Sequence, residues 1–289
     1  MLAEHRLANW HMPRPLALPF ASDESPAPHN NYYRSIWISD LHLGTRACKA
    51  EALLGFLRHH QADNLYLVGD IVDCWNLGGS WFWSEAQECV VREITMWRRQ
   101  GTRVVFLPGN HDEFNTDLVQ MLLGPILTQA ALVHRTAEGR RMLVTHGHQF
   151  DSSLSSMRWL SMMGGSAYTM ALRINEWYVR ERFRTRKASV SAYLKRRATK
   201  AVRYLTATGL DDRAVFDGVR EHKADGVICG HTHRVEQRLI GPIWYVNDGD
   251  WVENCTALVE NRDGTLRILQ WRLDEDGNDT GTTEIQEAS

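Results

Sequence analysis

The chain has 289 residues, of which 43% are hydrophobic, enough to bury the core of one large domain or two small ones. This composition excludes collagen-like, low-complexity and wholly disordered proteins. Because 33 basic residues face 35 acidic ones, the formal charge of -2 gives no whole-chain argument for a nucleic-acid or membrane partner. The five cysteines form no C-x-x-C pair, and no secretion signal or membrane-spanning apolar run is visible. We therefore expect a cytoplasmic protein.

The domain organisation follows from where hydrophobic periodicity begins, changes and ends. Residues 1–31 hold five of the eight prolines without periodicity, which predicts a flexible arm. Residues 32–273 alternate short apolar β-rich runs with helical patterns, which predicts an α/β domain with largely parallel strands. Within it, 152–208 has helical periodicity alone and reads as a helical insert, and the acidic segment 274–289 reads as a loose tail.

The expected strands are Ser35–Ser39, Leu65–Gly69, Arg103–Leu107, Met142–Thr145 and Gly226–Cys229, followed by a meander of Val235–Ile240, Ile243–Asn247, Thr256–Glu260 and Leu266–Trp271. The expected helices before the insert are Lys49–His60 and Ser84–Gln100.

Short polar motifs follow the expected strands directly. They are Asp40-Leu41-His42, Gly69-Asp70, Gly109-Asn110-His111-Asp112, His146-Gly147-His148 and Gly230-His231-Thr232-His233. Because ligands of open α/β sheets bind at the carboxyl ends of strands, we expect these segments to converge on one crevice. Each motif alone is weak evidence, since a single D-x-H or H-x-H pair is common at surfaces and turns. Their joint occurrence behind strands favours a metal centre, and the mixed oxygen and nitrogen ligands suit Mn²⁺, Fe²⁺, Zn²⁺ or Co²⁺.

The number of candidate ligands predicts two metal ions. Seven side chains are too many for one tetrahedral site and suit two ions that share a carboxylate, for which Asp70 is the natural bridge. Two such ions, ~3.5–4 Å apart, can hold a hydroxide that attacks phosphorus. His111 is one histidine more than the metals require, so we expect it to donate a hydrogen bond or a proton to the phosphate or leaving group. The seven expected ligands are Asp40, His42, Asp70, Asn110, His146, His231 and His233.

In this order, the motifs resemble those of the calcineurin-like metallophosphoesterase superfamily over about residues 34–271. The resemblance implies a four-layer α/β/β/α sandwich with a helical insert and two divalent metal ions, with Mn²⁺ expected ahead of Fe²⁺, Zn²⁺ or Co²⁺. It implies His111 as the acid or phosphate-stabilising group. It also implies Asp40, His42, Asp70 and His233 at one metal, and Asp70, Asn110, His146 and His231 at the other.

Three features are similar to bacterial UDP-2,3-diacylglucosamine pyrophosphatases of lipid A biosynthesis: the phrase Ile38–Leu43, the helical insert after His146, and the phrase Asn247–Trp251. That resemblance implies hydrolysis of UDP-2,3-diacylglucosamine to UMP and 2,3-diacylglucosamine 1-phosphate. In the best-known branch an arginine follows the metal-binding asparagine, whereas here His111 follows Asn110. The alternatives are another metallophosphodiesterase, acting on cyclic nucleotides or nucleic acid, and a non-catalytic scaffold of the same fold.

The insert concentrates positive charge. Between Arg173 and Arg203 there are eleven basic and two acidic residues, interleaved with bulky apolar side chains. A solvated face is one interpretation. The other is a lid that takes acyl chains and docks on phosphate or on an anionic membrane surface, as in the resembling enzymes, which would place the protein peripherally at the inner membrane. We expect Lys195, Arg196 and Lys200 to contact substrate phosphate, and no nucleic-acid partner, because no nucleic-acid-binding motif accompanies the charge.

An aromatic cluster follows the Asp70 motif. It consists of Trp75, Trp81, Phe82 and Trp83. Core packing is the favoured role for these side chains, and a wall of the substrate crevice is the alternative.

Overall fold

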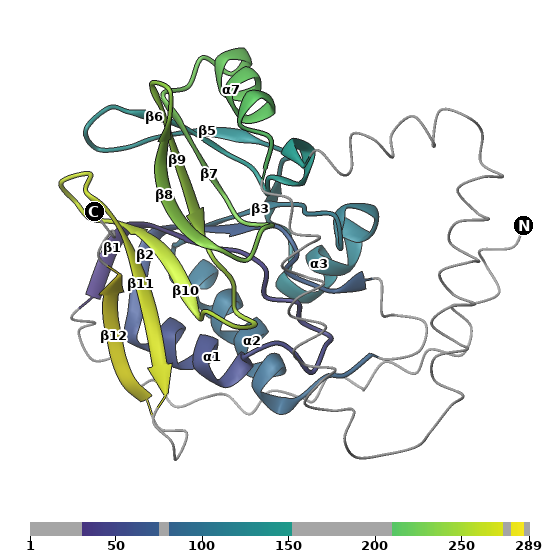
Figure 1. Ribbon diagram of the computed structural model, residues 1–289. Helices are drawn as coiled ribbons and strands as arrows, with labels where there is room; N and C mark the ends of the chain where they lie inside the picture. The colour runs from purple at the N-terminus through teal and green to yellow at the C-terminus, as the bar shows by residue number, and fades with distance from the viewer. Residues whose placement is uncertain (1–30, 75–80, 152–209, 274–278, 286–289) are drawn as a thin grey trace, which may run out of the picture.

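The computed structural model describes residues 31–74, 81–151, 210–273 and 279–285. The expected arm apart from Asn31, the insert with Lys195, Arg196 and Lys200, and Trp75 lie outside the described residues. Two β-sheets form the centre of the described part, with helices on their outer faces (Figure 1).

The larger sheet has the strand order β12-β11-β10-β1-β2-β3-β4. Its strands β1 to β4 pair in parallel, whereas β10, β11 and β12 are antiparallel additions on the other side of β1. The strands are β1 (Asn31–Ile38), β2 (His60–Val68), β3 (Arg103–Leu107), β4 (Leu127–Thr128), β10 (Thr256–Glu260), β11 (Leu266–Leu273) and β12 (Asp279–Ile285).

The smaller sheet has the order β5-β6-β7-β9-β8. Its central strands β6, β7 and β9 are parallel, and the edge strands β5 and β8 are antiparallel to their neighbours. The strands are β5 (Leu132–Arg135), β6 (Arg141–Val144), β7 (Gly226–Cys229), β8 (Val235–Ile240) and β9 (Ile243–Asp248).

Two of the helices begin at capping side chains that the sequence offers. The Ser84 hydroxyl accepts a hydrogen bond from the Gln87 N–H at the start of α2, and the Asp211 carboxylate accepts one from the Arg213 N–H at the start of α7. The helices are α1 (Ala50–His59), α2 (Glu85–Arg99), α3 (Thr116–Leu123) and α7 (Asp212–Glu221), with the short 3₁₀ turns η2 (Glu113–Asn115) and η3 (His148–Phe150).

Alternation of side chains along the strands builds the layers. In β1, Ile36 and Ile38 pack into a core with α1 and α2, whereas Trp37 between them points the opposite way, into the core shared by the two sheets. Across that middle core, Val144 and Ile228 come from the smaller sheet, whose outer face packs against α7. The order of layers is α1 and α2, large sheet, small sheet, α7, so the expected four-layer α/β/β/α sandwich is confirmed (Figure 1).

Two expectations about the C-terminal third are wrong. The four segments from Val235 onward do not form one meander: β8 and β9 are a hairpin of the small sheet, whereas β10 and β11 pair in the large sheet. Residues Asp279–Ile285, expected in a loose tail, form the edge strand β12 on β11. Sequence periodicity identifies strands but not their partners, because backbone hydrogen bonds pair strands across any separation along the chain.

A buried polar network joins the two sheets away from the polar motifs. The Glu260 carboxylate on β10 accepts hydrogen bonds from Arg34 (2.7 Å to Nη1) and from the Ala137 N–H (2.8 Å), and it lies 2.9 Å from His134 Nε2. The Tyr66 hydroxyl lies 2.9 Å from the other ring nitrogen of His134. Burial alone would raise the pKa of Glu260, but its contacts with His134, Ala137 and Arg34 lower it.

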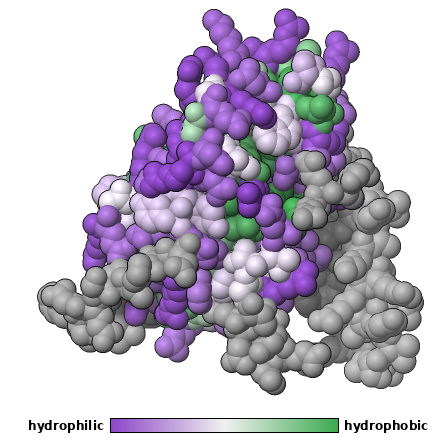
Figure 2. All heavy atoms as spheres, turned by 90° about the vertical axis from the view of Figure 1, so that its left-hand side faces the viewer, coloured by the Kyte–Doolittle hydropathy of each residue, from purple (hydrophilic) through white to green (hydrophobic). Residues whose placement is uncertain are grey.

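The outer surface is largely polar on the side that Figure 2 shows, where apolar residues appear in small areas between hydrophilic ones. Among the helices that the structure describes, none combines the length and the apolar character needed to cross a membrane.

Candidate metal centre

The expected ligands sit in strained turns at the strand ends. Five of them are non-glycine residues in the left-handed region, where a residue other than glycine costs about 1 kcal/mol or more. Backbone hydrogen bonds hold two of these turns against each other: the Asp40 N–H donates to the Gly69 carbonyl (3.0 Å), and the His42 N–H donates to the Asp70 carbonyl (2.9 Å). The five φ values are 53° at Asp40, 48° at His42, 53° at Asp70, 71° at His231 and 55° at His233.

Two glycines let these turns approach closely. A Cβ atom at Gly109 would overlap Asp70 Oδ1, and one at Gly230 would overlap Ser39 Oγ and Asp40 Oδ2. Glycine in the motifs G-N-H-D and G-H-T-H is therefore required by the space between neighbouring turns, not by a positive φ.

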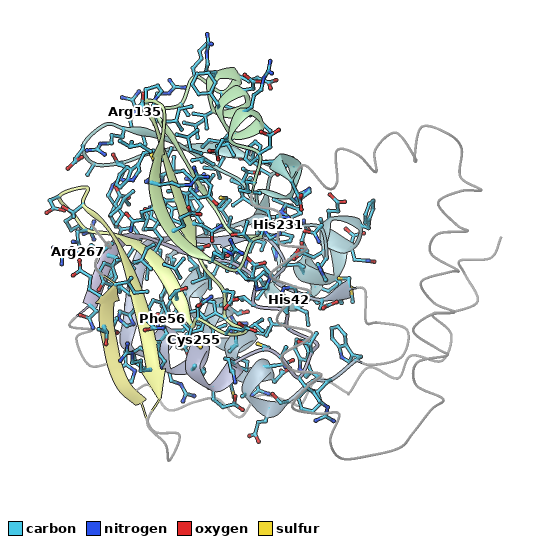
Figure 3. All side chains as sticks on the ribbon, in the orientation of Figure 1. His42, Phe56, Arg135, His231, Cys255 and Arg267 are labelled. Atoms are coloured by element: carbon cyan, nitrogen blue, oxygen red, sulfur yellow. The ribbon has the colours of Figure 1, made fainter. Side chains whose placement is uncertain are left out.

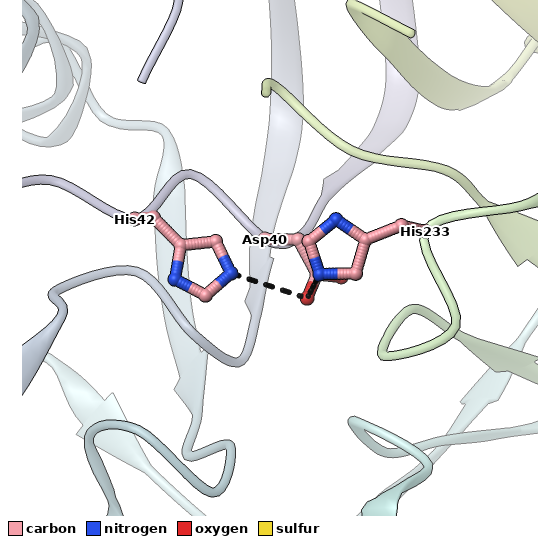
Figure 4. A group of neighbouring side chains, drawn as sticks. All are labelled: Asp40, His42 and His233. Atoms are coloured by element: carbon pink, nitrogen blue, oxygen red, sulfur yellow. Dashed lines mark ion pairs between the residues drawn. The ribbon is translucent and has the colours of Figure 1, made fainter. Parts of the chain in front are cut away.

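Asp40 joins ligands from both sheets. Its Oδ1 lies 3.3 Å from His233 Nε2 and 3.9 Å from His42 Nε2, and Figure 4 shows the two imidazoles on either side of it. Its Oδ2 accepts a hydrogen bond from the His231 N–H at 2.9 Å. Figure 3 shows His42 and His231 on the same side of the sandwich, although they follow strands of different sheets. The expected convergence on one place is observed.

Asp70 lies at the centre of the other histidines. Its Oδ2 is 3.5 Å from His146 Nε2 and 3.8 Å from the Nε2 atoms of His42 and His111, and its Oδ1 accepts a hydrogen bond from the His111 N–H (2.9 Å). Distances of 3.5 Å and above are too long for hydrogen bonds. They suit ligand atoms arranged around a cation, and the central place of Asp70 is the one a shared carboxylate would need.

The protonation pattern of His146 also fits a metal ligand. Its Nδ1 lies 2.9 Å from the Val68 carbonyl oxygen, which can only accept, so the ring proton is on Nδ1 and the lone pair is on Nε2. Within the described part of the chain, His146 Nε2, Asp40 Oδ1 and Asn110 Oδ1 are buried without a hydrogen bond. Buried ligand atoms left without partners are costly unless a cation satisfies them, so these residues fit a divalent metal.

The carboxylates and imidazoles of the centre shift one another's pKa values. Burial alone would raise the pKa of Asp70, but His146, His111 and His42 hold it far below its ordinary value. Burial alone would lower the pKa of His146, but Asp70 and Asp40 raise it to about 10. Both shifts show that the carboxylates favour positive charge beside them, which suits a cation site.

The structure brings the seven expected ligands together unequally. Ligand atoms within 4.8 Å of one another occur in Asp40, His42 and His233, and in Asp40, Asp70 and His146. His231 belongs to no such cluster among the described residues, and the Asn110 amide has its Oδ1 buried without a hydrogen bond there. The His231 ring faces His146 at 5.2 Å between centroids, and burial followed by the charge of His146 lowers the pKa of His231.

Asp73 is a site residue that the sequence reasoning missed. Its Oδ1 lies 3.4 Å from His111 Nδ1 and its Oδ2 lies 3.5 Å from His42 Nδ1. These three residues form a further cluster of metal-ligand type. We interpret Asp73 as their outer partner, because both rings direct Nε2 toward Asp70. The available signal was its spacing, three residues after Asp70 in G-D-x-x-D.

His111 lies beside both Asp70 and Asp73. Burial alone would lower its pKa, but the contact with Asp73 and the charge of Asp70 raise it above the ordinary value. A fifth of its side chain is exposed, so the ring reaches the surface of the centre. The neighbouring carboxylates favour the protonated form of this imidazole beside the expected metal ligands.

Two further carboxylates support the centre from outside. Asp250 Oδ2 lies 2.8 Å from His233 Nδ1, which fixes the proton on that nitrogen and leaves Nε2 to face Asp40. Asp112 accepts hydrogen bonds from the backbone N–H groups of Gly109 and Ile71, both at 2.7 Å, and so ties two ligand turns together. In the sequence, Asp250 could have been found as the last residue of the D-G-D motif, and Asp112 as the last residue of G-N-H-D.

The chain is similar in sequence to two hydrolases of low identity. A UDP-2,3-diacylglucosamine hydrolase from Photorhabdus laumondii is 26% identical over 208 residues, covering 69% of this chain and 82% of the relative. One from Klebsiella pneumoniae is 26% identical over 235 residues, covering 75% and 90%.

Solved structures with low similarity include Vps29 with zinc from Entamoeba histolytica and the phosphoesterase Yfce from E. coli. Vps29 is 17% identical over 87% of this chain and 97% of its own, with a TM-score of 0.43. Yfce is 18% identical over 87% and 99%, with a TM-score of 0.40. The family model described as Calcineurin-like phosphoesterase matches residues 33–235, so the chain belongs to that family and is a metal-dependent phosphoesterase.

Proposed function

We propose that the enzyme hydrolyses the phosphoanhydride of UDP-2,3-diacylglucosamine at a dinuclear centre, releasing UMP and 2,3-diacylglucosamine 1-phosphate. The observation that supports the dinuclear centre is the position of Asp70 Oδ2, which lies within 3.8 Å of three imidazole nitrogens. Asp40 Oδ1 lies near the Nε2 atoms of His42 and His233. The substrate rests on the two relatives of that name and on the phrases around Asp40 and Asp248.

The residues divide into two ligand sets that share Asp70. Asp40, His42, Asp70 and His233 would hold one ion, and Asp70, Asn110, His146 and His231 the other. Divalent ions bound there, Mn²⁺ in our proposal, supply Lewis acidity at the phosphoryl group and make water more acidic.

In the proposed reaction, a water molecule releases a proton to solvent and its oxygen forms a bond to one phosphorus, while the bond from that phosphorus to the bridging oxygen breaks. His111 contributes the proton or hydrogen bond that the departing phosphate needs, because Asp73 and Asp70 favour its charged form. The backbone N–H of His111 donates to Asp70 Oδ1, which fixes the start of this side chain relative to the ligands.

We propose further that Lys195, Arg196 and Lys200 of the insert contact substrate phosphate, that the insert touches anionic lipid at the inner membrane, and that the enzyme works in the cytoplasm. Nucleic acid is not a proposed substrate. The motifs and the charge of the insert support these proposals.

Hydrolysis of another phosphodiester is the second candidate, favoured by His111 in the place where the best-known pyrophosphatase branch has arginine. A panel of UDP-2,3-diacylglucosamine, a cyclic nucleotide, bis-p-nitrophenyl phosphate and a phosphate monoester, each with added Mn²⁺, tests both. Preference for the first, by at least about tenfold in kcat/KM, supports our proposal, whereas preference for the cyclic nucleotide or the diester refutes it. An inert protein that binds no metal would support the scaffold alternative.

His111→Gln tests the assigned role within the same panel. We expect metal content per chain to stay near that of the wild type while turnover falls about 10²–10⁴-fold, the usual contribution of a positioned acid. His222→Gln, an exposed histidine at the end of α7, is the matched control and should keep full activity. Loss of metal from His111→Gln would show that His111 is a ligand instead.

A further inference from the structure

A loop beside the candidate metal centre presents an arginine whose position is fixed by an aromatic ring. Arg46 lies four residues after the expected ligand His42, and its guanidinium carbon is 4.0 Å from the centre of the Phe82 ring. The Arg46 side chain is exposed, and within the described part of the chain it forms no ion pair with a carboxylate. Its positive charge is therefore available to an anion, on a loop that starts at the expected ligand His42.

The loop that carries Arg46 is tied to the ligand turn and to α2. The Thr45 N–H and hydroxyl both donate to the His42 carbonyl, at 3.2 and 2.9 Å. The buried Gln87 side chain accepts from the Gly44 N–H (3.0 Å) and donates to the Thr45 carbonyl (2.8 Å). Four hydrogen bonds thus fix the backbone immediately before Arg46 relative to His42.

The aromatic segment is fixed to the same loop. The Phe82 N–H donates to the Gly44 carbonyl (2.9 Å), and Trp81 stacks on Trp83 with ring centroids 5.4 Å apart. Gly44 has φ 96°, and a Cβ atom there would overlap the Trp81 ring. Trp81 and Trp83 pack against the large core, as favoured from sequence, whereas Phe82 supports Arg46.

A guanidinium that lies over an aromatic ring can still donate hydrogen bonds to an anion through the N–H groups in its plane. Arginine in this state binds phosphate through two parallel hydrogen bonds, and the ring reduces the freedom it would lose on binding. The metal ligands serve the phosphate that is attacked, so a second anionic group of the substrate needs a separate contact. Arg46 is a candidate because its loop starts at His42.

We propose that Arg46, supported by Phe82, binds the second phosphate of a diphosphate substrate, the one that is not attacked, and so selects phosphoanhydrides over esters with a single phosphate. This inference rests on the proposed function, because it names how that site would recognise its substrate class. A substrate with one phosphate has no second phosphate for Arg46 to bind.

The first test compares Arg46→Gln on two substrates. With UDP-2,3-diacylglucosamine we expect kcat/KM to fall about ten- to hundredfold, as for loss of a charged bidentate contact, while bis-p-nitrophenyl phosphate is cleaved within about twofold of the wild-type rate. Phe82→Leu should give a smaller loss on the diphosphate alone. Arg99→Gln removes the same charge at the far end of α2, about 20 Å along the helix, and should change neither substrate.

A binding measurement separates this inference from the proposed function. Mn²⁺-loaded protein is titrated calorimetrically with UMP and with the non-hydrolysable α,β-methylene analogue of UDP, which differ by one phosphorus group. In the wild type the diphosphate analogue should bind more tightly, and Arg46→Gln should weaken it about tenfold or more while UMP is unaffected.

If wild type fails to cleave UDP-2,3-diacylglucosamine but the analogue shows this dependence on Arg46, the proposed substrate is wrong and the role of Arg46 stands. Equal weakening of both ligands, or of neither, overturns the inference.

Discussion

Asp250 gives a sharp test of how the centre is built, because it touches a ligand histidine without being a ligand. Its Oδ2 lies 2.8 Å from His233 Nδ1, so the carboxylate accepts a hydrogen bond from the ring N–H. Burial alone would raise the pKa of Asp250, but His233 and the backbone donors lower it. Its other oxygen, Oδ1, accepts from the backbone N–H groups of Val252 (3.2 Å), Glu253 (2.8 Å) and Asn254 (2.7 Å).

Asp250→Asn should change the histidine tautomer without removing a side chain. The new carbonyl oxygen must remain on the three backbone donors, which places the amide NH₂ against His233 Nδ1. That nitrogen must then accept, and the ring proton moves to Nε2, the atom 3.3 Å from Asp40 Oδ1. An Nε2 that carries a proton cannot ligate a metal. Loss of such an outer partner costs about 10–100-fold in metal affinity, or about 1.4–2.7 kcal/mol.

The assay is calorimetric titration of chelator-stripped protein with Mn²⁺, together with metal content per chain by mass spectrometry. Thermal unfolding of the metal-free variant should show a loss of only about 1 kcal/mol, because the three backbone hydrogen bonds keep an acceptor. Asp263→Asn is the control, since this exposed carboxylate accepts from the Thr265 N–H (2.9 Å) in a remote turn. Unchanged Mn²⁺ affinity in Asp250→Asn, or an equal fall in the control, would refute the reasoning.

Two further predictions concern shared charge. Asp70→Ala should lower activity more than His231→Ala, because both proposed ions use Asp70. The measurement is kcat/KM together with metal content per chain. Equal and mild losses in the two variants would contradict a bridging role for Asp70. Glu260, whose folded pKa is lowered, contributes stability above its unfolded pKa of 4.5 that is lost as pH falls through the folded value. Glu260→Gln should therefore be about 1–3 kcal/mol less stable than the wild type at pH 7. The denaturant midpoint, measured as a function of pH, should fall less steeply in acid for the variant than for the wild type. If the two curves are parallel, the contact between Arg34 and Glu260 does not contribute to stability.

Much of the architecture follows from local pattern. The strand Arg103–Leu107 and the helix after Ser84 are predictable because alternation, apolar spacing and a capping hydroxyl are properties of a few neighbouring residues. α3 and α7 were not predicted, since α3 is short and α7 follows the long insert in which no boundary is evident. Their positions depend on packing against α2 and the small sheet.

The features of the metal centre also divide into those that local sequence predicts and those that depend on tertiary packing. The sequence by itself determined the kinds of ligand and their order, because each motif directly follows an apolar strand and parallel strands end at one edge. Only the tertiary structure decided that Asp73 lies behind His42 and His111 and that Asp250 orients His233. The physical reason is that these contacts require turns from separate strands to pack within hydrogen-bonding distance, and local preference does not specify which turns meet.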